Sequence, residues 1–402
     1  MKQLSVLFFT LLFTQNSFAQ KLNPTDFTQD LEYLKDSLPS NHKNLFAKIS
    51  REDFVKQINK IETQANDLDY DRFSTELLKL IVAIGDEHTR VWPNYDRFLP
   101  IKLSSFKEGY FVTQIDTSLS KLLLTQLVAI NNKPITEVVN QFEAVVLSEN
   151  TSFFDVNLMQ VINKPAILKG LGIITNINEV PLTFKTTDGK EETINLKSIG
   201  PKNNLKPVKP TQYSTLLSYK QNKNYWFEYN AENETLYFKY AKCQEDTSYP
   251  FVKFNSDLFK EIGEKNPKKL IIDLRDNSGG NSAILNPFFE ELASSYINKK
   301  GKLFVLIGKT TFSSALMNAV RFKRYTKAQL VGQPTSGNIN HYGEVRGFDL
   351  PKTKISISYS TKYWENWKGK KGPLLPDQNI AYSIESFRNS KDEALTYVYQ
   401  QK

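Results

Sequence analysis

Three short apolar runs constrain the fold more than any other feature of this 402-residue sequence. They span residues 270–274, 303–307 and 329–331, and each stops at a loop of small residues. Runs of this length, bounded by glycine and separated by helical patterns, are typical of buried parallel strands in βαβ units. The sequence therefore predicts an α/β domain whose chemistry lies at the carboxyl ends of these strands.

The loops after the first two runs carry residues suited to acyl transfer. Gly279 and Gly280 would let backbone N–H groups approach a ligand without a Cβ in the way. Ser313 lies where a loop gives way to a predicted helix over residues 314–322, whose free N–H groups favour negative charge. A serine nucleophile beside convergent backbone donors indicates an oxyanion hole. The alternative is that Ser313 or Ser314 only caps the helix.

Three motifs in this region resemble those of the C-terminal-processing serine peptidases and their relatives, the tricorn core protease and the interphotoreceptor retinoid-binding proteins. The first, D-x-R-x-N-x-G-G, runs from Asp273 to Gly280, and the second, T-x-S-[SA]-A, begins at Thr311. The third, V-G-x-P-T-x-G, begins at Val331. The resemblance covers residues 215–380 well and the rest of the chain loosely.

The resemblance implies an α/β fold, α+β overall, with a helical N-terminal domain, a PDZ-like β-rich middle and a crotonase/ClpP-like catalytic domain. It also implies a serine peptidase that needs no cofactor. In such an enzyme Ser313 would be the nucleophile, and the N–H groups of Gly279 and Ser314 would form the oxyanion hole.

Two positions depart from the family pattern. The Ser/Lys branch has a lysine general base after the last glycine of the third motif, where this chain has Asn338. The glutamate expected after Ala315 is Leu316. Either the base comes from elsewhere in the chain, or the protein is catalytically inactive.

Histidine is the natural replacement for the missing base, and the chain has only three. A predicted helix ends at Gly85 and is followed by Asp86-Glu87-His88-Thr89, which resembles the catalytic-histidine segment of the tricorn-like branch. We therefore predict His88 as the base and His341 as the alternative base. His42 is predicted to be structural. Taken alone, the local sequence is also compatible with His88 as a surface residue of a charged turn.

An acid is expected to orient the catalytic histidine. Glu365 is the nearest late acid for the role that a late glutamate has in the tricorn branch, and Glu87 or Asp86 could orient His88 directly. No metal site is predicted, since no two histidines share ligand spacing and there is no cysteine cluster.

The chain divides in order into five predicted segments. These are a signal peptide (1–19, with Gln20 as the mature start), a helical domain (20–95), a PDZ-like β-rich domain (96–200), a linker (201–222) and the peptidase domain (223–402). The PDZ-like match rests on the stretch 127–139, which reads as strand, turn and helix. We expect an exported chain, periplasmic or secreted, without an integral membrane segment.

The net charge of +9 comes from scattered lysines and arginines without a basic helix or an aromatic-basic nucleic-acid motif. We interpret this charge as a solvated basic surface; the alternative is a mild preference for acidic peptides or an anionic envelope surface. The predicted function is that of an exported serine endopeptidase acting on peptides or proteins, with no nucleic-acid partner. The alternatives are an inactive relative that binds peptides or other ligands, and a structural envelope protein.

Overall fold

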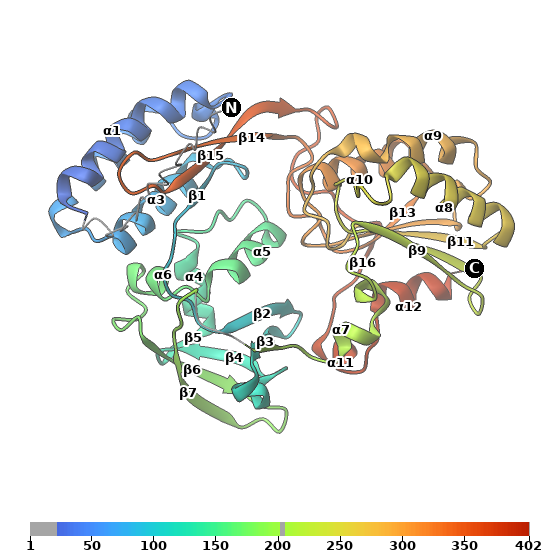
Figure 1. Ribbon diagram of the computed structural model, residues 1–402, viewed down its shortest axis with the longest axis horizontal. Helices are drawn as coiled ribbons and strands as arrows, with labels where there is room; N and C mark the ends of the chain where they lie inside the picture. The colour runs from blue at the N-terminus through green and yellow to red at the C-terminus, as the bar shows by residue number, and fades with distance from the viewer. Residues whose placement is uncertain (1–21, 202–205, 402) are drawn as a thin grey trace, which may run out of the picture.

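The computed structural model describes residues 22–201 and 206–401, and its elements gather into three parts (Figure 1). An N-terminal group of helices shares one part with a hairpin from late in the chain. A β-rich middle part and an α/β part complete the molecule. The predicted signal peptide, residues 1–19, lies outside the described residues. Within them, no helix is long and apolar enough to cross a membrane.

The N-terminal part is helical, as the sequence predicts. Each long helix starts at a side-chain cap, from Asn23, Ser50 and Asp69 in turn, because these side chains satisfy N–H groups of the first turn. The last helix ends at Gly85, whose φ of 75° is the left-handed conformation that glycine adopts freely. The elements are α1 (Pro24–Asn41), η1 (Leu45–Ala47), α2 (Arg51–Glu62), η2 (Ala65–Asp67) and α3 (Tyr70–Ile84).

A C-terminal hairpin packs onto these helices. It pairs with a short strand that follows α3, in the order β1-β15-β14. Ile355 and Ile357 of the hairpin region are buried in the same cluster as Leu31 and Phe54 of the helices. The strands are β1 (Arg90–Trp92), β14 (His341–Asp349) and β15 (Ser356–Trp364). The predicted domain boundaries stay a prediction. The sequence did not indicate that β14 and β15, which belong to the segment 223–402, pack on the N-terminal helices.

The middle part is a twisted antiparallel sheet with strand order β2-β3-β4-β6-β7, joined by β5 on β4 and β8 on β3. Asp188 and Gly189 lie in the turn that connects β6 to β7. The PDZ-like assignment stays a prediction. The elements are β2 (Ile101–Phe106), β3 (Gly109–Asp116), η3 (Thr117–Leu122), β4 (Gln126–Ile130), β5 (Lys133–Pro134), α4 (Ile135–Phe142), α5 (Thr151–Val161), α6 (Pro165–Gly170), β6 (Glu179–Lys185), β7 (Glu191–Lys197) and β8 (Pro207–Val208).

The α/β part contains a six-stranded sheet with the order β16-β13-β12-β11-β10-β9. The three predicted apolar runs are its adjacent parallel strands β11, β12 and β13, as expected. The strands are β9 (Tyr225–Asn230), β10 (Thr235–Tyr240), β11 (Lys269–Asp273), β12 (Leu303–Ile307), β13 (Gln329–Gly332) and β16 (Gln378–Asn379). The helical segments are α7 (Gln212–Thr215), η4 (Leu217–Tyr219), α8 (Phe251–Lys265), η5 (Ser282–Leu285), α9 (Asn286–Ser294), α10 (Ser313–Tyr325), α11 (Ile384–Arg388) and α12 (Glu393–Gln400).

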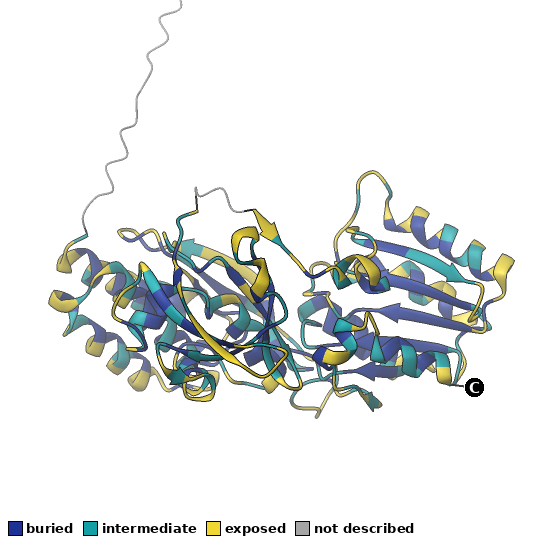
Figure 2. Cartoon of the chain, turned by 90° about the horizontal axis from the view of Figure 1, so that it is seen from below, coloured by how far each residue is buried: buried dark blue, intermediate teal, exposed yellow. Residues whose placement is uncertain are grey.

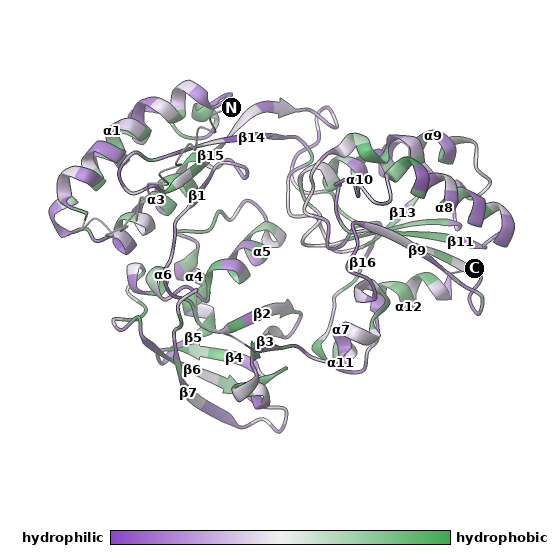
Figure 3. Cartoon of the chain, in the orientation of Figure 1, coloured by the Kyte–Doolittle hydropathy of each residue, from purple (hydrophilic) through white to green (hydrophobic). Residues whose placement is uncertain are grey.

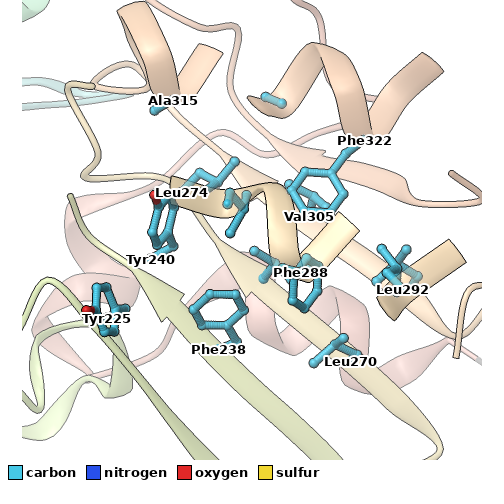
Figure 4. Packing of buried hydrophobic residues seen from close by; sticks show 14 of the residues in the cluster. Tyr225, Phe238, Tyr240, Leu270, Leu274, Phe288, Leu292, Val305, Ala315 and Phe322 are labelled. Atoms are coloured by element: carbon cyan, nitrogen blue, oxygen red, sulfur yellow. The ribbon is translucent and has the colours of Figure 1, made fainter. Parts of the chain in front are cut away.

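Both faces of this sheet are covered, which explains why its strands are continuous apolar runs. Alternate residues such as Leu270 and Val305 pack under α8, α9 and α10 (Figure 4), while Ile271 and Phe304 pack against α12. Figure 2 shows these strands buried and the outer faces of their helices exposed. Figure 3 shows the same strands as hydrophobic. The carboxyl ends of the strands face the other two parts, where their loops can form a site (Figure 1).

The contact between α1 and the returning hairpin depends on one buried carboxylate. Asp30 has no exposed surface and accepts three hydrogen bonds from the turn that connects β14 to β15. The donors are Lys352 N at 2.7 Å, Thr353 N at 2.8 Å and Thr353 Oγ1 at 2.6 Å.

We predict that Asp30→Ala lowers the free energy of unfolding by about 3 kcal/mol, because three donors, two of them buried, lose their acceptor. Urea unfolding followed by tryptophan fluorescence measures the change. The exposed Asp36→Ala on the same helix is the control and should change stability by less than about 0.5 kcal/mol. Equal effects of the two substitutions would contradict the proposed anchoring.

Candidate active site

Ser313 is the first residue of α10 and lies directly after the loop that follows β12. Its φ of 50° is a left-handed conformation that few residues other than glycine adopt, so the turn holds the serine in a strained geometry. Its Oγ forms no hydrogen bond with any residue that the structure describes. Neither serine caps the helix: the N-cap residue is Phe312, without a side-chain bond, and Ser314 Oγ donates to Gly280 O at 2.6 Å. The capping alternative is therefore wrong.

Gly279 lies directly against this serine. A Cβ at Gly279 would be 2.8 Å from Ser313 Cβ and 3.1 Å from Ser314 N, and the φ of 114° also disfavours a side chain. The Gly279 N–H, predicted to hold an oxyanion, donates instead to Asn277 Oδ1 at 2.9 Å. The N–H of Ser314 lies in the first turn of α10, where helices leave N–H groups unpaired. Of the two predicted donors, Ser314 is therefore the one without a competing hydrogen bond.

The loop that carries His88 is anchored by the carboxylate of Asp86. Its donors are His42 Nε2 at 2.9 Å, Thr89 Oγ1 at 2.6 Å, Ser360 Oγ at 2.6 Å and the His88 N–H at 3.2 Å. Burial alone would raise the pKa of this carboxyl, but the four hydrogen bonds outweigh it and hold the pKa well below its usual range. The prediction that His42 is structural is confirmed.

The imidazole of His88 is buried between two aromatic rings. It stacks on Phe312 with 4.6 Å between ring centroids and on His341 with 5.3 Å. Neither ring nitrogen has a hydrogen-bond partner among the described residues. Burial, assisted by the neighbouring His341, lowers the pKa of His88 to about 3, so the ring is neutral near pH 7. His88 is thus not a surface residue of a charged turn, and it lies against the residue that precedes Ser313.

His341, the predicted alternative base, belongs to the same cluster. Its Nδ1 lies 2.8 Å from Asn338 O, so Nδ1 carries the proton and Nε2 is free to accept one. Burial lowers the pKa of this histidine too. The structure therefore brings both candidate bases to one place.

The carboxyl of Glu87 binds the third motif and makes no hydrogen bond to the His88 ring. Both oxygens of its buried carboxyl face the Asn338 N–H, at 3.1 and 3.2 Å. A Cβ on Gly337 would be 2.9 Å from the Phe312 ring and 3.1 Å from Glu87 Oε1, so the motif needs glycine there. Burial, with Glu149 nearby, raises the pKa of Glu87 well above its usual value.

Glu365 is exposed and follows the end of β15. It makes no hydrogen bond or ion pair with His88 or His341, and none of the described carboxylates makes a hydrogen bond with the His88 ring. Through space, Asp86 favours the protonated form of both histidines. Asp86 is therefore the acid whose negative charge acts on both histidines.

Helix α5 of the middle part contributes contacts that the sequence did not predict. Ser152 Oγ donates to Pro334 O at 2.7 Å, and Asp155 pairs with Lys309 on the loop before Ser313. Phe153 packs against Phe312 with 5.7 Å between centroids. Phe312 occupies the variable position of the second motif, and its aromatic side chain was the only signal in the sequence for this contact.

Two cavities flank the cluster. One of about 430 Å³ lies between β2, α5 and the strand-end loops, with Arg275, Lys309 and Tyr382 in its wall. The other, of about 250 Å³, is mainly apolar and includes Arg90, Val146 and Phe153.

Among residues 22–201 and 206–401, no group of acidic, histidine or cysteine side chains could hold a metal ion.

One segment of the chain, which includes most of the α/β part and the returning hairpin, matches a known family. Residues 234–371 match the model of peptidase family S41. These residues therefore resemble an S41 peptidase domain, and the match indicates a serine-type peptidase. The predicted family resemblance is confirmed.

Solved structures share the fold at low identity. The structure of mature CPAF complexed with lactacystin is 14% identical, with a TM-score of 0.65, and the match covers 93% of this chain and 97% of that chain. The structure of mature CPAF alone is 13% identical, with a TM-score of 0.65, over 93% of this chain and 96% of that chain. The photosystem II D1 C-terminal processing protease is 10% identical, over 92% of this chain and 98% of that chain, with a TM-score of 0.42. No curated protein sequence matches this chain.

We predict that Asp86→Asn lowers the free energy of unfolding by about 3 kcal/mol at pH 7, because an amide offers fewer acceptors to the same donors. The carboxyl has a lowered pKa in the folded state, so its contribution is present above the unfolded pKa of about 3.9 and is lost as the pH falls. The difference between wild type and variant should therefore shrink below about pH 4.

Urea unfolding between pH 3 and 8 tests this, with the exposed Asp67→Asn as the control. A difference that stays constant across this pH range would show that the carboxylate charge does not stabilise the loop.

Proposed function

We propose that the chain is a serine endopeptidase in which Ser313 of the S41 match is the nucleophile and His88, from the N-terminal part, is the general base. The observation that carries the proposal is the stacking of His88 on Phe312, the neighbour of Ser313, at 4.6 Å. This contact joins a loop more than two hundred residues upstream to the strained serine at the start of α10. A free hydroxyl beside a neutral, unpartnered imidazole supports nucleophilic catalysis.

In this mechanism Ser313 Oγ attacks the peptide carbonyl and His88 accepts the hydroxyl proton. His88 then donates that proton to the departing amine, and a water molecule hydrolyses the acyl-enzyme by the same steps. The N–H of Ser314 donates to the oxyanion, while Gly279 can do so only if its bond to Asn277 is shared or exchanged. The hydrogen bond between Ser313 and His88 forms when substrate is bound, since such bonds are often long in unliganded enzymes.

The acids act from a distance in this proposal. Asp86 stabilises the imidazolium through its charge and holds the loop by accepting the His88 N–H. Glu87 positions Asn338, whose carbonyl oxygen fixes the tautomer of His341. Glu365, exposed and without contact to the cluster, is assigned no direct role at His88.

A catalytically inactive binding protein is the second candidate. Two observations favour it: the position of the lysine base is occupied by Asn338, and both ring nitrogens of His88 are buried without a partner. Such a protein would keep its affinity for peptides when Ser313 is replaced. The labelling of Ser313 separates the two candidates.

We predict that a fluorophosphonate probe labels Ser313 of the wild type between pH 5 and 9 and does not label Ser313→Ala. His88→Ala should slow labelling by about 10² to 10⁴-fold, the usual contribution of a general base. His341→Ala should slow it by less than about tenfold. Peptide mapping by mass spectrometry identifies the labelled serine, and Ser294→Ala, exposed on α9, is the control.

If His341→Ala is the unreactive variant, the base is His341 and the assignment of His88 is wrong. If the folded wild type is not labelled at all, the binding protein becomes the better candidate.

We further propose that the chain is exported. The support is the sequence of residues 1–19, with Lys2, an apolar stretch and a small-x-small cleavage site. The expected product is a chain that begins at Gln20 and is found outside the cytoplasm. Intact-mass measurement of fractionated cells checks this, and an unprocessed chain in the cytoplasm would contradict it.

A further inference from the structure

A lysine-rich loop next to the candidate active site has no assigned role. It spans residues 366–373 and carries Lys368, Lys370 and Lys371, all exposed. None of the three forms an ion pair among the described residues, and neither does the adjacent Arg324. Glu365 is the nearest acid in sequence and is also unpaired there, while Asp377 is taken by Lys323. The loop therefore presents a net positive surface.

The loop is held rigidly by its backbone and by one tryptophan. Asn340 Nδ2 donates to Trp367 O and to Lys370 O, each at 2.8 Å, and Trp367 N donates back to Asn340 Oδ1 at 2.9 Å. The guanidinium of Arg324 lies 5.5 Å from the Trp367 ring centroid, and the Lys370 ammonium 5.2 Å. The backbone of the loop and two of the cations, Arg324 and Lys370, are thus held before any partner arrives, which lowers the entropy cost of binding.

The same loop is joined by hydrogen bonds to the third motif, next to the cluster of His88, His341 and Phe312. Ile339 N donates to Gly372 O at 2.9 Å, and Asn338 forms an antiparallel bridge with Pro373. Asn338 is bound by Glu87, and the preceding Gly337 touches the ring of Phe312. The loop is therefore bonded to the third motif, which packs against the residue that precedes Ser313.

We propose that this lysine-rich loop binds an acidic segment of the polypeptide substrate, a few residues away from the bond that is cut. The inference rests on the proposed peptidase function and adds a substrate class to it. Arg324, which lies over Trp367 of the loop, is eleven residues from Ser313 along α10, or about 16 Å at 1.5 Å per residue. An extended peptide at about 3.3 Å per residue covers that distance in roughly five residues. Exposed Leu375 and Tyr325 border the loop, so apolar residues next to the acidic ones fit the same surface.

The hydrogen bonds between the lysine-rich loop and the third motif favour an acidic polypeptide over an anionic membrane as the partner. The lysines are bonded through their backbone to the residues that hold His341, so their position is coupled to the place where a peptide is cut. A membrane-binding patch needs no such connection. Opposite charges across the surface would act mainly on the rate of encounter and on selectivity.

The test compares two peptide substrates that differ only in three acidic residues or three glutamines, placed three to six positions from the scissile bond on either side. We expect kcat/KM for the acidic peptide to be about 5- to 10-fold higher at 20 mM salt, with the advantage falling at 300 mM salt because mobile ions screen exposed charges. Lys368→Gln/Lys370→Gln/Lys371→Gln should remove this advantage while the glutamine peptide is still cut.

The matched control is Lys265→Gln/Lys299→Gln/Lys300→Gln, which removes three exposed lysines near the amino ends of β11 and β12. It should keep the preference for the acidic peptide. Equal cleavage of both peptides by the wild type at low salt would overturn the proposal. So would loss of the preference in the control alone.

Two further measurements separate this inference from its premises. The affinity of the Ser313→Ala chain for the two fluorescent peptides reports recognition without turnover, so an acidic preference there supports the loop's role even if no peptide is cut. Vesicles of phosphatidylglycerol test the competing partner. If the loop variant loses vesicle binding but keeps the peptide preference, the surface binds anionic lipid and the proposal is wrong.

Discussion

The buried carboxylate of Asp86 is the interaction on which the rest of the site depends. It joins the end of α1 through His42, the loop after α3 through Thr89 and the His88 N–H, and β15 through Ser360. A buried charge with several hydrogen-bond donors is stable only when all of them are in place. Asp86 therefore keeps three segments, distant in sequence, at one position, and His88 is part of that assembly.

The return of β14 and β15 to the N-terminal helices also brings segments that are distant in sequence together, over a larger part of the molecule. The S41 domain supplies the serine, the glycines and the sheet, but its late hairpin leaves the sheet and completes the part that holds His88. The candidate site is thus built between parts of the molecule rather than within one. Such a site can be assembled only after the whole chain has folded, which couples the chemistry proposed for Ser313 to the stability of contacts such as that of Asp30.

Local sequence predicted the elements well where one physical cause dominated. The apolar runs are strands because both faces of the sheet are covered, and α3 ends at Gly85 because glycine adopts a left-handed conformation freely. The predictions were weaker where side chains compete for the same group. Asn277 takes the N–H of Gly279, and Glu87 binds Asn338 instead of His88. No spacing rule reveals these bonds, since each depends on where another loop lies.

The sequence by itself determined the strands, the order of the three motifs, the serine at the head of a helix and the short list of histidines. These follow from periodicity, glycine geometry and residue chemistry, which act over a few positions. Only the tertiary structure decided that His88 stacks between Phe312 and His341, that no acid bonds to the His88 ring, and that the lysine-rich loop adjoins the third motif. Long-range packing and buried hydrogen bonds decide such matters, and they become defined only when distant segments come together.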